Sequence, residues 1–255
     1  MSSIGKWFVD VLRFAITGNP WPYYFEVDGI YYSRNGSDVT VTAGKNQYSG
    51  RVVVPASVTR KNKTYRVSAI GESAFEGCKE LTDVVIPDSA MSVGNYAFEG
   101  CSALASIVIG KSVASLGDRV FAKCPNLRSV TLRSESIVAA RYNWIKNVPT
   151  LFGAKVREYI IGDGVTAIGR DAFYGCFDIK SLTISGSVKK IGKGAFCGCQ
   201  DLRDITCLAE NAPAVEGDIF IRVPLESATL RVPASAVERY KATAPWSGFN
   251  AILPI

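Results

Sequence analysis

The sequence predicts a β-rich repeat solenoid of the α/β class, right-handed and built from 23-residue units, with a cap at each end. Three observations predict this fold. A short phrase containing Phe and Cys recurs five times, a fixed set of apolar positions follows each copy, and weaker copies of the repeat stand at both ends of the array.

Residues 1–22 are predicted to form an amphipathic N-terminal helix. Apolar residues recur at helical spacing, polar residues such as Asp10 and Arg13 lie on the other face, and residues 18–20 (Gly-Asn-Pro) end the pattern. We expect this helix to pack on the folded body. A helix on a membrane surface and a degenerate export signal are the alternatives.

Residues 23–50 are predicted to form an N-terminal β cap. Apolar residues alternate along this stretch, and the alternation is broken at Asn35-Gly36 and Ala43-Gly44. Alternation interrupted by such turn residues indicates a β meander. A solenoid needs a cover of this kind because its terminal coil otherwise exposes an apolar face.

Residues 51–208 are predicted to form the solenoid itself. The recurring phrase places a Phe and, three residues later, a Cys once in every 23 residues. We expect the Phe to fill the interior of each coil and the Cys residues to stack as buried free thiols, whose parallel directions suit disulfides poorly. We expect Cys197 to lie on an exposed turn. The repeated residues are Phe75, Phe98, Phe121, Phe173 and Phe196, and Cys78, Cys101, Cys124, Cys176 and Cys199.

Three apolar positions follow each Cys with the spacing L-x-x-L-x-L, which is typical of a leucine-rich repeat with one short strand per coil. A Gly after the apolar residue that opens each phrase supplies a position without a side chain as the coil turns. The apolar sets are Leu81/Val84/Ile86, Leu104/Ile107/Ile109, Leu127/Val130/Leu132, Val156/Tyr159/Ile161, Ile179/Leu182/Ile184 and Leu202/Ile205/Cys207.

One unit, at residues 133–155, departs from the pattern. The interval from Phe121 to Phe173 equals two periods plus six residues, and Trp144 stands one period after Phe121. We therefore interpret this stretch as a degraded repeat with a six-residue insertion after Trp144. The insertion is either a functional loop or a bulge without a role.

Residues 209–255 are predicted to hold the last degenerate repeat and a C-terminal cap. The stretch 229–236 (TLRVPASA) matches 51–58 (RVVVPASV) near the start of the array. The remainder reads as a short helix followed by an apolar tail.

At this point the chain resembles the BspA-like leucine-rich repeat proteins of host-associated anaerobic bacteria. The resemblance rests on "SAIGESAFEGCKELTDVVIPDS", "FEVDGIYYSRNGSDVTVT" and "LRVPASAVERYKATAPWSGFNAILPI", and it runs from about Phe25 to Ile255. It implies a protein of the cell surface or a secreted protein. It also implies host extracellular-matrix proteins or other cells as partners.

The composition limits the chemistry that is available. The chain of 255 residues contains no His, which removes Ser-His and Cys-His nucleophiles and every His-ligated metal site. No nucleotide-binding glycine loop is present, and no run of eighteen apolar residues could span a membrane. We expect no enzymatic activity, no cofactor and no metal.

The candidate binding residues form one basic row. Counting from the repeat places Arg128, Arg157, Lys180 and Arg203 at equivalent outward positions beside four consecutive strands. Such a row suits an acidic partner, either a protein segment or an acidic glycan, whereas a solvated face neutralised by Glu158 and Asp204 is the alternative. Nucleic acid is not expected because no aromatic residues interleave the row. The rival function is a structural spacer without its own ligand.

Overall fold

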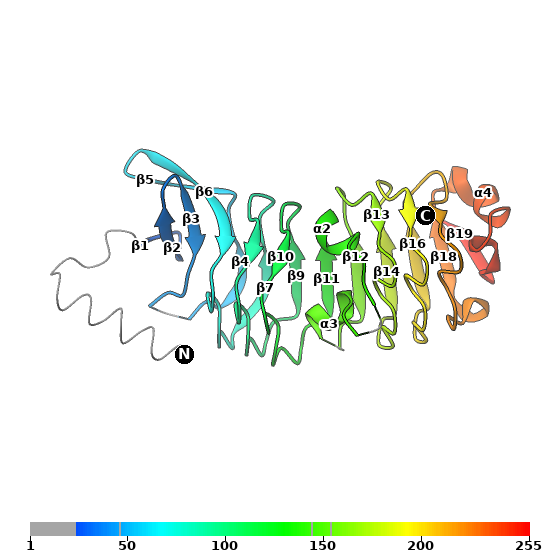
Figure 1. Ribbon diagram of the computed structural model, residues 1–255, viewed down its shortest axis with the longest axis horizontal. Coiled ribbons are helices and arrows are strands. Elements are labelled where there is room, and N and C mark those ends of the chain that lie inside the picture. The colour runs from blue at the N-terminus through cyan, green and yellow to red at the C-terminus, as the bar shows by residue number, and fades with distance from the viewer. Residues whose placement is uncertain (1–23, 46, 144, 154) are drawn as a thin grey trace.

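A row of short parallel strands runs along the molecule, one strand from each turn of the chain. The computed structural model describes residues 24–45, 47–143, 145–153 and 155–255, which stack as coils along one axis (Figure 1). The helix predicted over residues 1–22 and Trp144 lie outside the described residues. The prediction of a β-rich repeat solenoid is confirmed.

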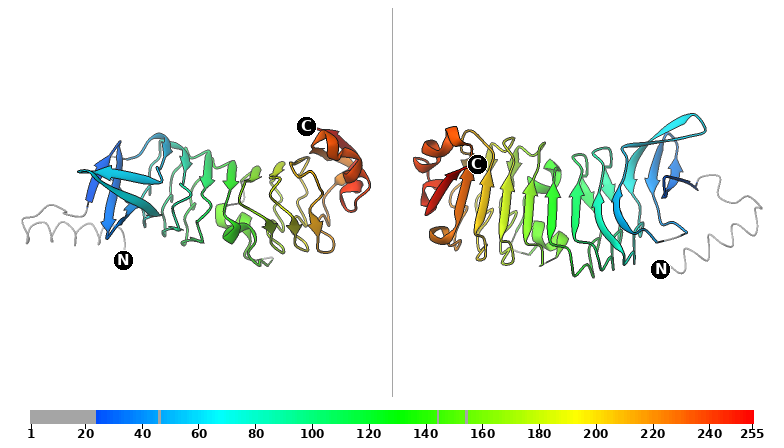
Figure 2. Two further views of the ribbon diagram at one scale, coloured as in Figure 1. Left: turned by 90° about the horizontal axis from the view of Figure 1, so that it is seen from above. Right: turned by 180° about the vertical axis from the view of Figure 1, so that it is seen from behind.

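The larger sheet has nine strands, all paired in parallel, and Figure 2 shows them side by side. In sheet order the strands are β19 (Ala251–Pro254), β18 (Thr229–Val232), β16 (Asp204–Cys207), β14 (Ser181–Ile184), β12 (Glu158–Ile161), β11 (Ser129–Leu132), β9 (Ser106–Ile109), β7 (Leu81–Val85) and β4 (Gly50–Val53). Each strand is short because it carries only two of the three apolar positions of a repeat, the last two in β9, β11, β12, β14 and β16 and the first two in β7.

A second row of strands follows another side of the coils and is interrupted once. Its first part is a seven-stranded sheet that begins with an antiparallel meander and continues in parallel. Its second part is a separate three-stranded parallel sheet. The first part holds β1 (Tyr24–Val27), β2 (Ile30–Asn35), β3 (Asp38–Val41), β5 (Ser57–Arg60), β6 (Lys63–Ile70), β8 (Ser92–Val93) and β10 (Ser115–Leu116); the second holds β13 (Ala167–Ile168), β15 (Lys190–Ile191) and β17 (Ala214–Val215).

Short helices mark the irregular parts of the solenoid. In the degraded repeat, α2 (Glu135–Val138) is capped by Ser134 and α3 (Val148–Phe152) by Asn147 in a capping box. At the C-terminal end, α4 (Val237–Lys241) follows β18 and the chain returns as β19. The 3₁₀ turns there are η1 (Leu225–Ser227), η2 (Ala234–Ala236) and η3 (Trp246–Gly248).

The core is a continuous column of stacked side chains. Every member of the six predicted apolar sets is buried. The repeated Phe rings stack from coil to coil, with centroids 4.9 Å apart for Phe75 and Phe98 and 5.5 Å apart for Phe98 and Phe121. In the degraded repeat Phe152 continues the column, with its ring centroid 5.0 Å from that of Phe121. The insertion therefore precedes the aromatic residue that fills this coil.

All seven cysteines are free, and four of the five repeated ones are buried as predicted. The Sγ of Cys101 lies 3.0 Å from the Phe75 carbonyl oxygen, and the Sγ of Cys199 lies 3.3 Å from that of Phe173, so each thiol donates to the coil before it. Cys124 is only half-buried, contrary to the prediction, because the next coil does not pair with its turn. The prediction for Cys197 is also wrong, since its backbone is bonded to Gly175 of the preceding coil and the side chain is buried.

The repeated Gly is required by the close approach of neighbouring coils. A Cβ atom at Gly94 would lie 2.5 Å from the Glu72 amide nitrogen, and one at Gly192 would lie 2.6 Å from that of Arg170. Any side chain at these positions forces the backbones apart. The expectation drawn from the repeat is therefore confirmed at both positions.

Candidate functional site

The outward surface of the nine-stranded sheet, here called the strand face, is organised in columns. Parallel in-register pairing places equivalent residues of successive coils at steps of ~4.8 Å. A basic row precedes the strands, and a small polar column begins them. A third column runs through their middle: Val53, Val85, Val108, Thr131, Ile160, Thr183, Thr206, Arg231 and Leu253.

The structure brings the four predicted cations together in one row. The Arg157 amide donates to the Arg128 carbonyl oxygen at 2.8 Å, and the Lys180 amide donates to the Arg157 carbonyl oxygen at 2.8 Å. The Arg203 amide donates to the Lys180 carbonyl oxygen at 3.1 Å. The four residues therefore occupy consecutive rungs of a single hydrogen-bonded ladder.

The two cations at the ends of the row turn back onto their own coils. The Nη1 atom of Arg128 donates to the Pro125 carbonyl oxygen at 2.7 Å. The Nη1 atom of Arg203 donates in the same way to the Gln200 carbonyl oxygen at 2.8 Å. These bonds cap the turn before each strand, so part of the hydrogen-bonding capacity of both guanidinium groups is used within the chain.

Arg157 and Lys180 differ from the end cations. Both side chains are exposed, and no hydrogen bond or ion pair engages either head group in the part of the chain that the structure describes. Their backbones lie on adjacent rungs, so two free cationic side chains extend from a fixed frame. A ligand would meet these two charges first.

The carboxylates beside the row have other partners. Glu158 accepts a hydrogen bond of 2.7 Å from the Ser129 hydroxyl, and Asp204 forms an ion pair with Arg231, Oδ1 to Nη1, at 3.0 Å. Their charges still lie near the row, but their oxygen atoms do not pair with Arg157 or Lys180. The neutralisation that the sequence suggested is therefore at most a through-space effect, weakened by solvent and salt.

From Val53 to Thr206 the middle column of the strand face is an apolar and β-branched stripe, which Arg231 separates from Leu253. Val85, Val108 and Ile160 are half-exposed along it, and Val53 at one end is 53% exposed. Threonine occupies most of the intervening coils. The strand face therefore offers a flat contact strip beside a cationic edge, a combination that suits an extended partner.

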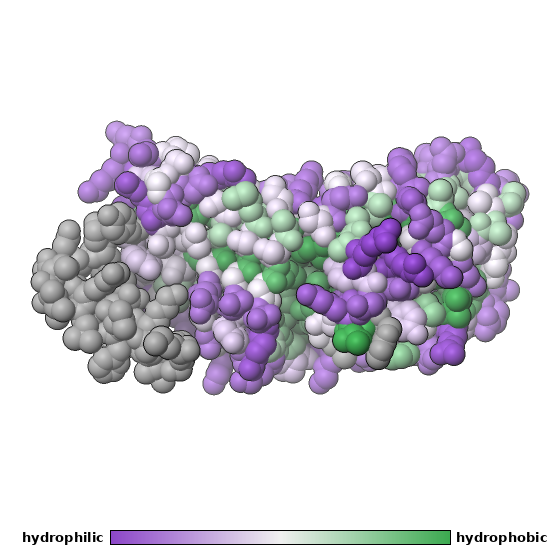
Figure 3. All heavy atoms as spheres, in the orientation of Figure 1, coloured by the Kyte–Doolittle hydropathy of each residue, from purple (hydrophilic) through white to green (hydrophobic). Residues whose placement is uncertain are grey.

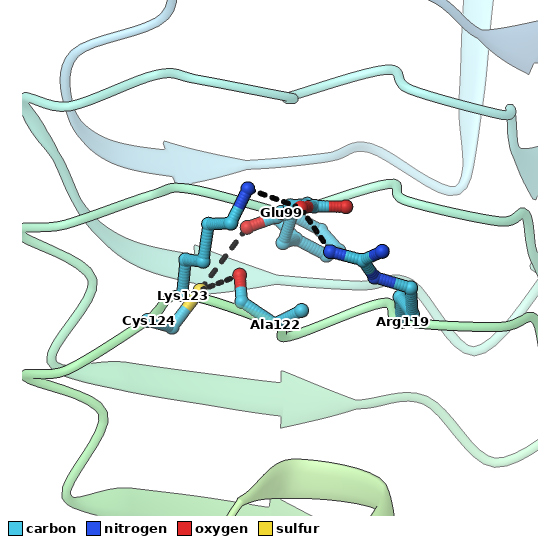
Figure 4. A network of polar contacts seen from close by, with 6 residues as sticks. Glu99, Arg119, Ala122, Lys123 and Cys124 are labelled. Carbon is cyan, nitrogen blue, oxygen red and sulfur yellow. Dashed lines mark hydrogen bonds and ion pairs between the residues drawn. The ribbon is translucent and has the colours of Figure 1, made fainter. Parts of the chain in front are cut away.

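A second polar cluster, which the sequence reasoning missed, joins two coils on the opposite side (Figure 4). The Glu99 carboxylate, whose side chain is 10% exposed, meets Lys123 Nζ at 2.9 Å and Arg119 Nη2 at 2.8 Å. The hydrogen bond from Lys123 and the nearby Arg119 charge lower the pKa of the Glu99 carboxyl. The available signal was Lys123, which stands where the other four phrases have Gly. This cluster ties coils together and presents no free group.

Comparison with known proteins gave one family and several solved structures. A sequence profile of the BspA type leucine rich repeat region matches residues 57–156 and 152–240 in six copies. No curated protein matches the chain. A leucine-rich repeat protein from Bacteroides ovatus is 28% identical, with 83% of this chain and 59% of that chain covered and a TM-score of 0.47. The chain thus spans 59% of the length of that protein.

Two further solved structures are similar. The T. pallidum leucine rich repeat protein is 22% identical, with 81% of this chain and 90% of that chain covered and a TM-score of 0.46. A leucine rich cell surface protein from Faecalibacterium prausnitzii is 17% identical, with 91% of this chain and 95% of that chain covered and a TM-score of 0.31.

Proposed function

The chain belongs to the BspA-type leucine-rich repeat family, and from that premise we propose that it is a non-enzymatic surface or secreted protein whose strand face binds an acidic partner. The partner is a host protein, such as an extracellular-matrix protein with an acidic segment, or a sulfated glycan. Within the described residues no helix has the length and apolar character needed to cross a bilayer.

One observation carries the proposal: Arg157 and Lys180 stand exposed on adjacent rungs, and no group of the described chain occupies them. Extended acidic chains carry charges at short regular intervals. A row fixed at ~4.8 Å steps meets such charges without ordering a loop, so little conformational entropy is lost on binding.

The neighbouring columns support the same partner. The stripe beside the row offers flat apolar contact, and the carboxylates between the two are already bonded to Ser129 and Arg231. The internal bonds of Arg128 and Arg203 favour the rival function, a spacer without a ligand, because they give these two cations a structural role.

Retention on immobilised heparin separates the two functions. We expect the Arg157→Ser/Lys180→Ser double variant to elute at clearly lower salt than the parent, since both free cations are lost. The matched control is Lys189→Ser/Lys193→Ser, which removes the same charge at two exposed positions outside the strand face. Equal losses in both variants would show that net charge alone is sensed. If the parent does not bind heparin at low salt, the proposal that the partner is a glycan is contradicted. The same variants tested for binding to an immobilised acidic host protein decide whether the partner is a protein.

A further inference from the structure

Between the coil that contains β10 and the coil that contains α2 and α3, the second row of strands and the ladder of the Phe turns are interrupted, although β9 and β11 still pair across this point. Elsewhere the turn that carries the repeated Phe donates N–H groups to the next coil. Phe75 donates to Ala97 at 2.8 Å, and Phe98 donates to Val120 at 3.0 Å. After the break the same ladder resumes, with Phe173 donating to Ala195 at 2.7 Å.

At the break the equivalent donors have no acceptor within the described residues. One period after the donors of the preceding coil stand the N–H groups of Arg119, Phe121 and Lys123. None of the three donates to a group in the described chain. Unpaired backbone donors in a row, next to a fully paired neighbour, form an open edge.

The carbonyl side of the same coil is also open. In the preceding coil Met91 and Val93 accept from Ala114 and Gly117, both at 2.8 Å. One period later Ala114 and Leu116 are the equivalent acceptors, and no N–H group of the described chain reaches them. Strand β10 is therefore the last strand of its sheet, and β13 begins a new one.

The helices of the degraded repeat explain the break. In α2 the amides of Val138 and Ala139 donate to Ser134 and Glu135 within their own turn, and in α3 the Asn147 and Pro149 carbonyls accept from Thr150 and Gly153. These bonds run within the helical turns, and in the described chain no backbone group of α2 or α3 pairs with β10. The degraded repeat thus has two capped helices in place of one rung of the ladder.

A groove of about 390 Å³ lies at the break, within the range of about 300–1,000 Å³ that is usual for ligand clefts. Leu116, Ile137 and Leu151 supply its apolar wall. Arg141 and Lys146, both exposed, supply its charge, and no Asp or Glu is among the described residues that line it. On the face drawn in Figure 3, hydrophobic surface gathers near the middle of the molecule, where Figure 1 places β10 and α2.

We propose that this groove binds an extended acidic peptide segment of a partner protein, which pairs with β10 as an added strand. A peptide is indicated because Ala114 and Leu116, which line the groove, have backbone carbonyls without a partner in the described chain, and another polypeptide backbone can donate N–H groups to them in register. An acidic peptide is indicated because the lining carries two cations and no carboxylate. Apolar side chains on alternate residues of the peptide would contact Leu116 and Ile137. The site is separate from the strand face and does not depend on it.

The premise is tested first by amide hydrogen exchange on the free protein. The amides of Arg119, Phe121 and Lys123 should exchange at least tenfold faster than their paired equivalents, of which Phe98 and Gly100 are examples. Equal protection in both turns would show that the edge is closed and would overturn the proposal.

The ligand is tested by selecting a displayed library of random dodecapeptides on the full chain. Counter-selection uses the Arg141→Glu/Lys146→Glu variant. We expect enriched peptides with an excess of Asp and Glu and with apolar residues at alternate positions. Synthetic copies should bind that variant at least tenfold more weakly than the parent, and they should slow exchange at Phe121.

Two control variants make the result specific. Lys189→Glu/Lys193→Glu changes the charge equally at exposed positions outside the groove, and Arg157→Ser/Lys180→Ser removes the basic row. Both should bind the peptides as the parent does. Enriched peptides without an acidic excess, or peptides that bind all four proteins alike, would overturn the proposal while leaving the strand-face proposal untouched.

Discussion

Removal of one ring from the aromatic column tests the repeat architecture at its centre. The Phe98 side chain is fully buried, and its ring is stacked between those of Phe75 and Phe121, with centroid separations of 4.9 Å and 5.5 Å. Replacement by Ala leaves a cavity shared with both neighbouring coils, which cannot close because their backbones are held by ladder hydrogen bonds. Substitutions of this kind cost about 3–5 kcal/mol in the free energy of unfolding.

Urea unfolding followed by circular dichroism measures this loss. With the slopes of about 1–3 kcal/mol per molar that are usual for urea, the midpoint of Phe98→Ala should fall by about 1 M or more. Phe177→Ala is the matched control, because that ring is 59% exposed and its loss should cost less than about 0.5 kcal/mol. A Phe98→Ala midpoint equal to that of Phe177→Ala would refute the column as the core of the fold.

The pKa of the Glu99 carboxyl is lowered from 4.5, chiefly by the hydrogen bond from Lys123, so the carboxylate stabilises the fold above that pH and the stabilisation is lost as the pH falls through the folded pKa. The urea midpoint of Glu99→Gln should therefore lie below that of the parent near neutral pH, and the difference between the two midpoints should narrow in acid. A difference independent of pH would contradict the ion pair. Burial raises the pKa of the Cys176 thiol to about 12 and that of the Cys124 thiol to about 11. Both thiols should therefore react slowly with iodoacetamide in the native protein, and Cys124 should react before Cys176 because it is half-exposed. Mass spectrometry that shows Cys176 labelled as fast as an unfolded thiol would contradict this burial. Gly94→Ala should lower the free energy of unfolding by about 1–3 kcal/mol, and with it the melting temperature, because the added Cβ meets the backbone of the preceding coil. An unchanged melting temperature would show that the coils can move apart freely.

The regular part of the fold was predictable because one period repeats the same physical requirements. A residue such as Leu182 or Phe196 is buried wherever the phrase recurs, so each copy supports the interpretation of the others. The row of Arg128 to Arg203 followed from the same counting. Position along a repeat determines which rung a residue occupies, and the backbone ladder confirms those rungs.

The degraded repeat was not predictable in the same way. Spacing aligned Trp144 with the repeated Phe, but Phe152 occupies the column because the chain folds into α2 and a loop before it reaches the core. The 23-residue spacing alone does not tell whether the extra residues of a repeat come before or after the aromatic residue that enters the core. The break in the ladder depends on the backbone hydrogen bonds of α2 and α3, which the apolar pattern does not encode.

Side-chain direction was the other limit. Arg128 and Arg157 occupy equivalent positions, yet Arg128 donates to the Pro125 carbonyl and the Arg157 side chain has no partner among the described residues. Neutralisation of the row by Glu158 was the alternative that the sequence left open, and its carboxylate accepts a hydrogen bond from Ser129. Local partners decide these outcomes: the Pro125 carbonyl in the turn before β11 and the Ser129 hydroxyl at the start of that strand.

The most direct test of the strand face as a binding surface is the acetylation rate of Lys180 with and without a bound partner. The protein is treated with a limiting acetylating reagent in the presence or absence of a heparin oligosaccharide or an acidic host protein, and each lysine is quantified by mass spectrometry. Lys193, which is exposed and follows β15 of the three-stranded sheet, serves as the internal reference. Binding through the strand face predicts strong protection of Lys180 and no protection of Lys193. Equal rates at Lys180 with and without a partner that demonstrably binds the chain would contradict it.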